Sequence, residues 1–127
     1  MHVSVTLLYG GLTFLLVTLL GLNVSYARGK HKAGFGTMPE VMSREIRAHG
    51  NAAEWAPLAI VLLLLLELSG VERLALHALG GTIVLGRVVH GVGALVPKRN
   101  PLTTLGALVN YLVTAVLCVW AIARHFA

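Results

Sequence analysis

The 127-residue sequence contains no aspartate and a single cysteine, Cys118. Aspartate is a common ligand of Mg²⁺ and Ca²⁺, so its absence removes a usual component of a site for either ion. A single cysteine cannot form a disulfide within the chain, and this one lies in an apolar run. The histidines show no spacing typical of a metal centre. We therefore predict neither a disulfide framework nor a metal site.

Charged side chains are also scarce. They make up 12% of the sequence, against 57% apolar residues, which is about half the charged share of a soluble domain. A soluble domain of this composition would expose large apolar patches, so the sequence indicates an integral membrane protein. The net charge of +5 does not indicate a nucleic-acid partner, because most lysines and arginines flank apolar runs, where they set membrane topology.

Four apolar segments predict transmembrane helices at about residues 3–27, 43–68, 74–96 and 102–124. The first has no formal charge, and its roughly 25 residues would extend about 37 Å as a helix, enough to cross a bilayer. We expect it to be retained, because it is longer than the apolar core of a cleavable signal. The connections are short, so the prediction is a single all-α domain, a bundle of four transmembrane helices.

The basic residues predict the orientation of this bundle. Two connections and the helix ends beside them contain most of the basic residues: Arg28, Lys30, Lys32, Arg44, Arg47, Lys98 and Arg99. The opposite side has only Arg73 and Arg124. Because the more basic side of a membrane protein stays in the cytoplasm, both termini are expected on the non-cytoplasmic side.

The second segment combines a polar start with an apolar continuation. Its charge-free part, Trp55 to Leu66, is too short to span a bilayer. The helix must therefore begin near Ser43, whose hydroxyl we expect to cap it, and its polar start must lie at or below headgroup depth. A spacing of three, four and three residues puts four polar side chains within about 80° of arc on one face. They are Arg44, Arg47, Asn51 and Glu54.

These side chains predict a binding site. An ionisable group in a membrane helix costs at least about 2.5 kcal/mol near the midplane, so it must face protein, water or a ligand. Arginine suits a carboxylate, an asparagine amide suits a peptide group, and a carboxylate such as Glu54 suits an ammonium group. The pattern is typical of a receptor for a small zwitterionic or anionic peptide. The alternative is an ion pair, for example between Glu54 and Arg87, that only fixes helix packing.

Two motifs resemble signatures of a known family. Arg47-Ala48-His49-Gly50-Asn51-Ala52-Ala53-Glu54, followed by an aromatic residue, a proline and a leucine run, resembles the second-helix signature of the MAPEG family (membrane-associated proteins in eicosanoid and glutathione metabolism). Gly86-Arg87-Val88-Val89-His90 resembles the third-helix signature of the same family. Chain length, helix count and orientation agree, so the resemblance covers almost the whole chain.

The resemblance implies a homotrimer, in this case of the bacterial inner membrane, with glutathione as co-substrate at cytoplasm-facing sites between subunits. It implies that Arg47, Asn51 and Glu54 hold glutathione and that Arg87 and His90 line or support the site; Arg44 extends the same stripe. The implied activity is that of a transferase or peroxidase acting on lipophilic electrophiles. The expected partners are further copies of the chain, membrane lipids and lipophilic small molecules, but no nucleic acid.

The sequence departs from the pattern of the catalytic members near Ala94 and near Leu102-Thr103, and Gly50 stands where some members have a second arginine. Several of them have a tyrosine about one turn after the histidine and an arginine near the start of the fourth helix, where this chain has Ala94 and Thr103. A thiol with the ordinary pKa of about 8.5 needs a nearby positive charge or donor to ionise at neutral pH. The remaining candidates for thiol activation are Lys98, Arg99, Arg44 and Tyr111.

Two alternatives to the enzyme remain open, and the departure suggests the first of them. One is a non-catalytic MAPEG-like protein that binds glutathione or lipid. The other is a small transporter or channel subunit, suggested by Arg87 within an apolar span, although the polar stripe stays on one side of the membrane.

Overall fold

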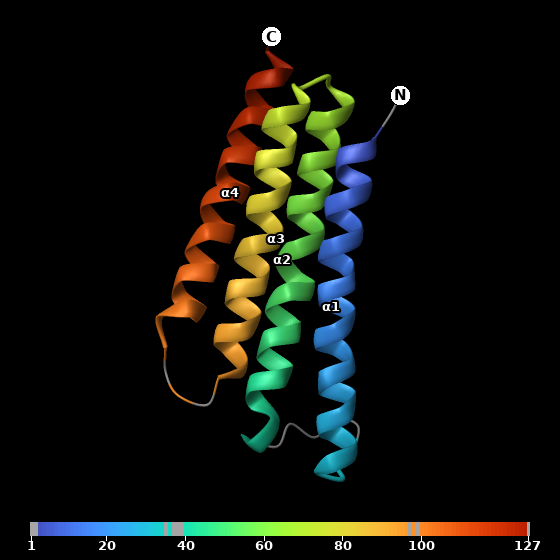
Figure 1. Cartoon of the computed structure of the whole chain (residues 1–127), viewed down its shortest axis with the longest axis vertical. Coiled ribbons are helices and arrows are strands. Elements are labelled where there is room, and N and C mark those ends of the chain that lie inside the picture. Colours follow the sequence, from blue (N-terminus) through green and yellow to red (C-terminus); the bar gives the residue numbers. More distant parts are fainter. Residues whose placement is uncertain (1–2, 35, 37–39, 97, 99, 127) are drawn as a thin grey trace.

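In the computed structural model, which describes residues 3–34, 36, 40–96, 98 and 100–126, the chain forms a bundle of antiparallel helices. The elements are α1 (Ser4–Lys30), a 3-10 turn (Glu40–Met42), α2 (Ser43–Leu68), α3 (Arg73–Leu95) and α4 (Pro101–His125). Figure 1 shows α2 and α3 between α1 and α4, and within the described residues α1 and α4 do not touch. The start of α1 and the end of α4 lie at the same end of the bundle.

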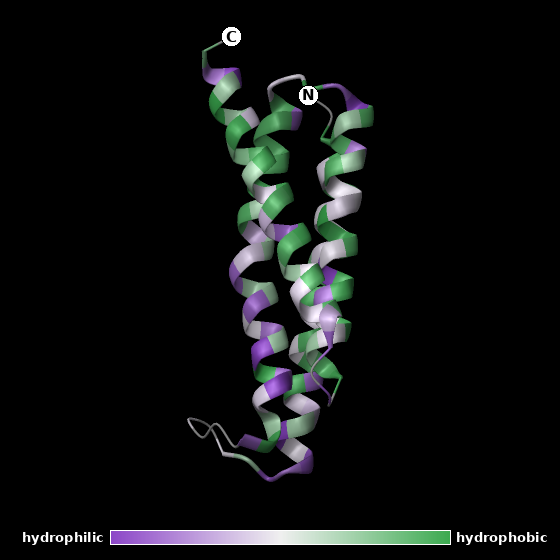
Figure 2. Ribbon diagram, turned by 90° about the vertical axis from the view of Figure 1, so that its left-hand side faces the viewer, coloured by the Kyte–Doolittle hydropathy of each residue, from purple (hydrophilic) through white to green (hydrophobic). Residues whose placement is uncertain are grey.

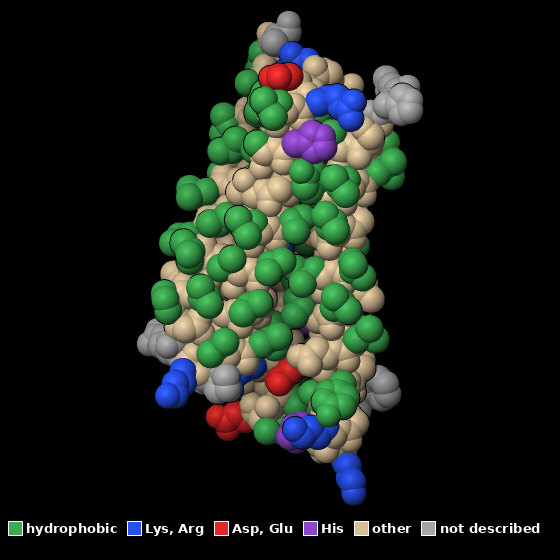
Figure 3. Space-filling view, viewed as in Figure 1, with side chains coloured by type: hydrophobic (Ala, Val, Ile, Leu, Met, Phe, Trp, Pro, Cys, Tyr) green, Lys and Arg blue, Asp and Glu red, His purple; other side chains and the backbone are tan. Residues whose placement is uncertain are grey.

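The predicted fold class, an all-α membrane protein with four transmembrane helices, is confirmed. The 4 long helices are each apolar enough to cross a membrane. Figure 3 shows apolar side chains over the middle of the molecule and charged side chains towards its two ends. In Figure 2 the hydrophilic residues gather in one half of the bundle, towards the connections that follow α1 and α3. We call this end, where α1 and α3 end and α2 and α4 begin, the basic end.

The start of α2 differs from the prediction. Ser43 is its first residue, and Met42 occupies the cap position without a side-chain hydrogen bond. The expectation that the Ser43 hydroxyl caps the helix was wrong, because the chain enters α2 through the 3-10 turn and not from an extended residue, as side-chain capping usually requires. Pro57 lies inside α2, which continues through it.

Glycines let α3 and α4 approach each other at backbone distance near the basic end. A Cβ atom added to Gly106 of α4 would overlap the backbone of His90, and one added to Gly93 of α3 would lie 2.8 Å from the carbonyl carbon of Leu102. Small residues at helix contacts allow this close packing in membranes. The first turns of α4 are therefore held directly against the last turns of α3.

The opposite end of the bundle contains the larger apolar core. Its fully buried members include Leu63 and Leu66 of α2, Leu76 and Ile83 of α3, and Leu117 of α4. Near the basic end the second cluster is smaller and has alanines on α2, Ala48 and Ala52, packed with Leu20. The small side chains of these alanines let α2 pack closely against α1. The polar face of α2 is then on the side that faces α3 and α4.

Glu67, near the end of α2, caps the start of α1. Its carboxylate accepts hydrogen bonds from the backbone N–H groups of Val5, at 2.9 Å, and Thr6, at 2.7 Å. The first N–H groups of a helix have no partner within the helix, and the positive end of its dipole attracts a carboxylate. This contact ties the first helix to the second at the end opposite the basic end.

Replacing Glu67 by alanine is expected to lower the free energy of unfolding by about 1–2 kcal/mol, because two N–H groups lose their acceptor. The measurement is the unfolding midpoint in detergent. Glu72, an exposed carboxylate at the same end that makes no side-chain cap hydrogen bond, provides the matched control as Glu72→Ala. Equal midpoints for the two variants would mean that the contact contributes nothing.

Candidate functional site

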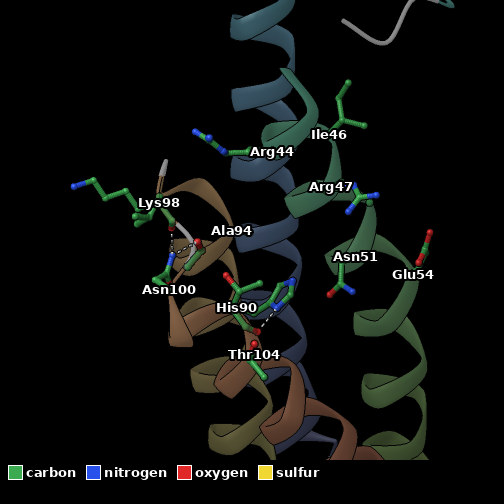
Figure 4. Close-up of a pocket in the computed structure, with 14 residues that line it drawn as sticks. Arg44, Ile46, Arg47, Asn51, Glu54, His90, Ala94, Lys98, Asn100 and Thr104 are labelled. Carbon is green, nitrogen blue, oxygen red and sulfur yellow. Dashed lines mark hydrogen bonds between the residues drawn. The ribbon is translucent and has the colours of Figure 1, made fainter. Parts of the chain in front are cut away.

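A cavity of about 780 Å³ lies at the basic end, between the first half of α2, the last turns of α3 and the first turns of α4. Figure 4 shows residues of all three helices around it. Its volume lies within the range of sites for small molecules, roughly 300–1,000 Å³. The polar residues that line it are Arg44, Arg47, Asn51, Glu54, His90, Lys98, Asn100, Thr103 and Thr104.

The four polar residues predicted on one face of α2 all line this cavity: Arg44, Arg47, Asn51 and Glu54. The two arginines and Glu54 are exposed, whereas Asn51 is half-buried. In Figure 4 the side chain of Asn51 points from α2 towards α3. The angular spacing in the sequence is therefore reproduced as one wall of the cavity.

Arg87 lies behind this wall and does not line the cavity. Its side chain is 3% exposed, and its Nη1 donates hydrogen bonds to Asn51, at 3.0 Å to Oδ1 and 3.4 Å to the backbone oxygen. Within the part of the chain that the structure describes, Nε and Nη2 have no partner. The alternative of an ion pair between Glu54 and Arg87 is wrong for this structure, because the guanidinium group turns to Asn51 and Glu54 stays at the cavity.

His90 brings an imidazole ring to the cavity from α3. Its side chain is 8% exposed, and Nδ1 lies 3.0 Å from the backbone oxygen of Thr103 (Figure 4). A carbonyl oxygen only accepts, so Nδ1 must be the donor. In the neutral ring the other nitrogen, Nε2, is then an acceptor, and it makes no hydrogen bond to the described residues.

The start of α4 forms the third wall, and Asn100 fixes its position. The Asn100 Oδ1 accepts from Leu102 N at 3.1 Å, while its Nδ2 donates to Gly93 O at 3.0 Å. An asparagine cap followed by proline as first helical residue is a known helix-start signal. Sequence reasoning missed Asn100 and Thr104 as cavity residues, although it predicted the start of this helix at about residue 102.

The candidates for thiol activation lie in different places. Arg44 and Lys98 line the cavity, but the amine of Lys98 extends away from Asn51 and His90 in Figure 4. Tyr111 does not line it; its ring packs against Trp55, with the ring centres 4.9 Å apart. Arg99 lies outside the described residues. Ala94 and Thr103, near the positions where the resemblance leads us to expect the tyrosine and the arginine of several catalytic members, both line the cavity.

The arrangement can bind a molecule that has more negative than positive groups. Three cationic side chains, Arg44, Arg47 and Lys98, line the cavity with one carboxylate, Glu54. Arginines pair well with carboxylates, and Glu54 can accept from an amine. Asn51 adds a directed amide: its Oδ1 is taken by Arg87, so its Nδ2 is left to donate.

Comparison with known proteins adds two findings. The sequence model of the MAPEG family matches residues 6–123. The inner membrane protein YecN of Escherichia coli strain K12 is 36% identical over 91 residues, which cover 70% of this chain and 69% of that protein. The inner membrane protein YecN of Escherichia coli O6:H1, strain CFT073, matches with the same identity and coverage.

Proposed function

This chain belongs to the MAPEG family, and from that membership we propose that it is a glutathione-dependent transferase or peroxidase acting on lipophilic electrophiles in a bacterial inner membrane. The observation that carries the proposal is the cavity at the basic end, where two arginines, an asparagine and a glutamate from one face of α2 lie opposite His90 of α3.

Glutathione has the groups that this cavity would recognise. It is a tripeptide with two carboxylates, one ammonium group and two peptide groups. Arg44 and Arg47 would bind the carboxylates and Glu54 the ammonium group. The amide of Asn51 would donate to a peptide oxygen, because Arg87 holds its Oδ1 at 3.0 Å and so fixes which end of the amide faces the ligand.

The location of the cavity suits a reaction between water-soluble glutathione and a lipophilic electrophile. The basic end would face the cytoplasm by the positive-inside rule, where glutathione is available. The helices around the cavity carry exposed apolar side chains on their outer faces, such as Leu58 and Val92, so a lipophilic electrophile would arrive from the bilayer. In the proposed homotrimer a neighbouring subunit would complete the open side of the cavity. Fixed orientation of the two reactants would supply much of the rate enhancement.

A thermal-unfolding measurement in detergent tests the proposal. Glutathione is expected to raise the unfolding midpoint of the wild type, because it binds only the folded state. Arg47→Ala and Glu54→Ala are each expected to weaken binding about tenfold or more, since a hydrogen bond to a charged group contributes about 1.5–3 kcal/mol. Arg73→Ala removes an exposed arginine at the opposite end and should leave the affinity unchanged.

Two results would reject the proposal: no glutathione-dependent shift of the wild-type midpoint, or unchanged affinity in both cavity variants when they fold.

A second candidate function is favoured by Ala94 and Thr103 at the cavity. It is a non-catalytic protein that binds glutathione or lipid. This candidate predicts binding without conjugation of chlorodinitrobenzene, and measurable turnover would exclude it.

A further inference from the structure

Resting on the function proposed above, we propose that His90 is the base that removes the proton from the glutathione thiol at the first turn of α4. This role does not depend on an arginine at the start of α4. For this step the sequence offered only Lys98, Arg99, Arg44 and Tyr111.

The hydrogen bonding of His90 suits a base. The Thr103 carbonyl oxygen, 3.0 Å from Nδ1, requires a proton on Nδ1 and leaves the Nε2 lone pair free to accept another. The side chain is more than nine-tenths buried, at 8% exposure, yet it lines the cavity. Nε2 makes no hydrogen bond to the described residues and is not fully buried. The carbonyl can keep its hydrogen bond when the ring becomes an imidazolium cation.

The packing of α3 against α4 fixes the position of this base. The backbone of His90 lies against Gly106, and Gly93 lies against the backbone of Leu102 and Thr103. These close backbone contacts, together with the hydrogen bond to Thr103, hold the ring at the first turn of α4. A general base needs this kind of fixed geometry, because proton transfer requires hydrogen-bond distance.

The first turn of α4 provides a suitable place for the sulfur. The positive end of a helix dipole stabilises an anion, and thiols at helix N-termini ionise more readily than free thiols. Thr103 and Thr104 also line the cavity at this point, and Figure 4 shows Thr104 beside His90. Their hydroxyl groups can donate to a thiolate. Because Arg44 and Arg47 lie on the facing helix, where they would bind the two terminal carboxylates, the side chain of the central cysteine of glutathione would point towards α4.

The S–H bond of glutathione breaks, its proton forms an N–H bond at Nε2, and the electron pair stays on sulfur. The thiolate then attacks the ring carbon of chlorodinitrobenzene that carries chlorine. A C–S bond forms, the C–Cl bond breaks, and chloride leaves with its electron pair. The imidazolium group returns its extra proton to water.

The test compares His90→Gln with a matched control. Glutamine cannot take up the thiol proton, but its amide can still donate to the Thr103 carbonyl. His49→Gln is the control, because His49 also bonds a backbone carbonyl, Val17 O at 3.2 Å, and does not line the cavity. Three quantities are measured for each protein: the glutathione-dependent midpoint shift, the ultraviolet absorbance of the bound thiolate, and turnover of chlorodinitrobenzene.

His90→Gln is expected to bind glutathione within a few-fold of the wild type and to lose the thiolate absorbance. Its turnover of chlorodinitrobenzene is expected to fall at least about a hundredfold. His49→Gln should retain all three properties. Adding imidazole to His90→Ala is expected to restore part of the turnover. Thiolate absorbance and turnover in His90→Gln equal to the wild type would overturn the role of His90 and leave the proposed function standing. Absence of glutathione binding by the wild type would instead overturn the proposed function.

Two further outcomes are decisive. A wild type that binds glutathione without forming thiolate would also overturn the role of His90. If the His90 variants do not fold, the wild type can be treated with diethylpyrocarbonate, which modifies accessible histidine nitrogens. Glutathione is expected to protect His90 and not His49. Failure of the reagent to modify His90, or equal modification with and without glutathione, would overturn the assignment.

Discussion

Replacing Gly106 by alanine is expected to destabilise the bundle by about 3 kcal/mol or more, at the upper end of the range for overpacked sites. The Cβ atom of the new residue would overlap N, Cα and Cβ of His90 on the neighbouring helix. Two of these are backbone atoms, so no side-chain rotation can make room for the methyl group. The start of α4 would have to move away from α3, and the hydrogen bond from His90 to Thr103 would be lost with it.

The sign of this effect separates it from ordinary helix propensity. Alanine favours a helix over glycine by about 1 kcal/mol where no contact opposes it. Gly11, which lies inside α1 and is exposed, has no atom within 4 Å of an added Cβ. Gly11→Ala is therefore expected to keep or slightly raise the unfolding midpoint, while Gly106→Ala lowers it strongly.

Both variants can be compared by thermal unfolding in the same detergent, followed by circular dichroism. Gly106→Ala should also lose the glutathione-dependent midpoint shift, because the cavity lies between the helices that separate. An unchanged midpoint in Gly106→Ala would mean that α3 and α4 are further apart than the structure places them.

The sequence was sufficient to predict the fold class and one wall of the cavity. Long apolar segments can satisfy their backbone only as helices in a membrane, and the period of the helix determines which side chains share a face. Arg44, Arg47, Asn51 and Glu54 are neighbours on α2 for this local reason, and the structure places them along one cavity.

Contacts between helices could not be predicted in the same way. Periodicity gives the direction of a side chain but not the rotation of the next helix, so it could not exclude an ion pair between Glu54 and Arg87, whereas in the structure Arg87 turns to Asn51. The third wall depends on Gly93 and Gly106, each of which meets the backbone of another helix. In the sequence these two glycines do not differ from Gly11, which meets nothing.

The second large effect is expected at Arg87, where stability and binding should change in opposite directions. Replacing Arg87 by methionine is expected to raise the free energy of unfolding by about 1–4 kcal/mol, the range found when a buried ion pair is replaced by apolar side chains of similar volume. Arg87 is 3% exposed, and within the described residues Nε and Nη2 have no hydrogen-bond partner. Methionine fills a similar space with a flexible apolar chain.

The same substitution is expected to weaken glutathione binding about tenfold, equivalent to about 1.4 kcal/mol, which is a typical value for one hydrogen bond. Without Arg87 the Asn51 amide loses the 3.0 Å contact at Oδ1. It is then free to rotate and no longer presents a fixed donor to the ligand. Lys30→Met, which removes an exposed charge at the end of α1, should change neither the stability nor the affinity appreciably.

Unfolding midpoints with and without glutathione, measured for Arg87→Met, Lys30→Met and the wild type, separate the two explanations for a buried arginine. If Arg87 served mainly to hold the helices together, methionine would lower the midpoint without ligand, and affinity would fall only because the fold weakened. A higher midpoint together with weaker binding would show that the chain tolerates an unfavourable buried charge because it orients Asn51. A lower midpoint with unchanged affinity would contradict that role for Arg87, and Asn51 would then need another cause for its orientation.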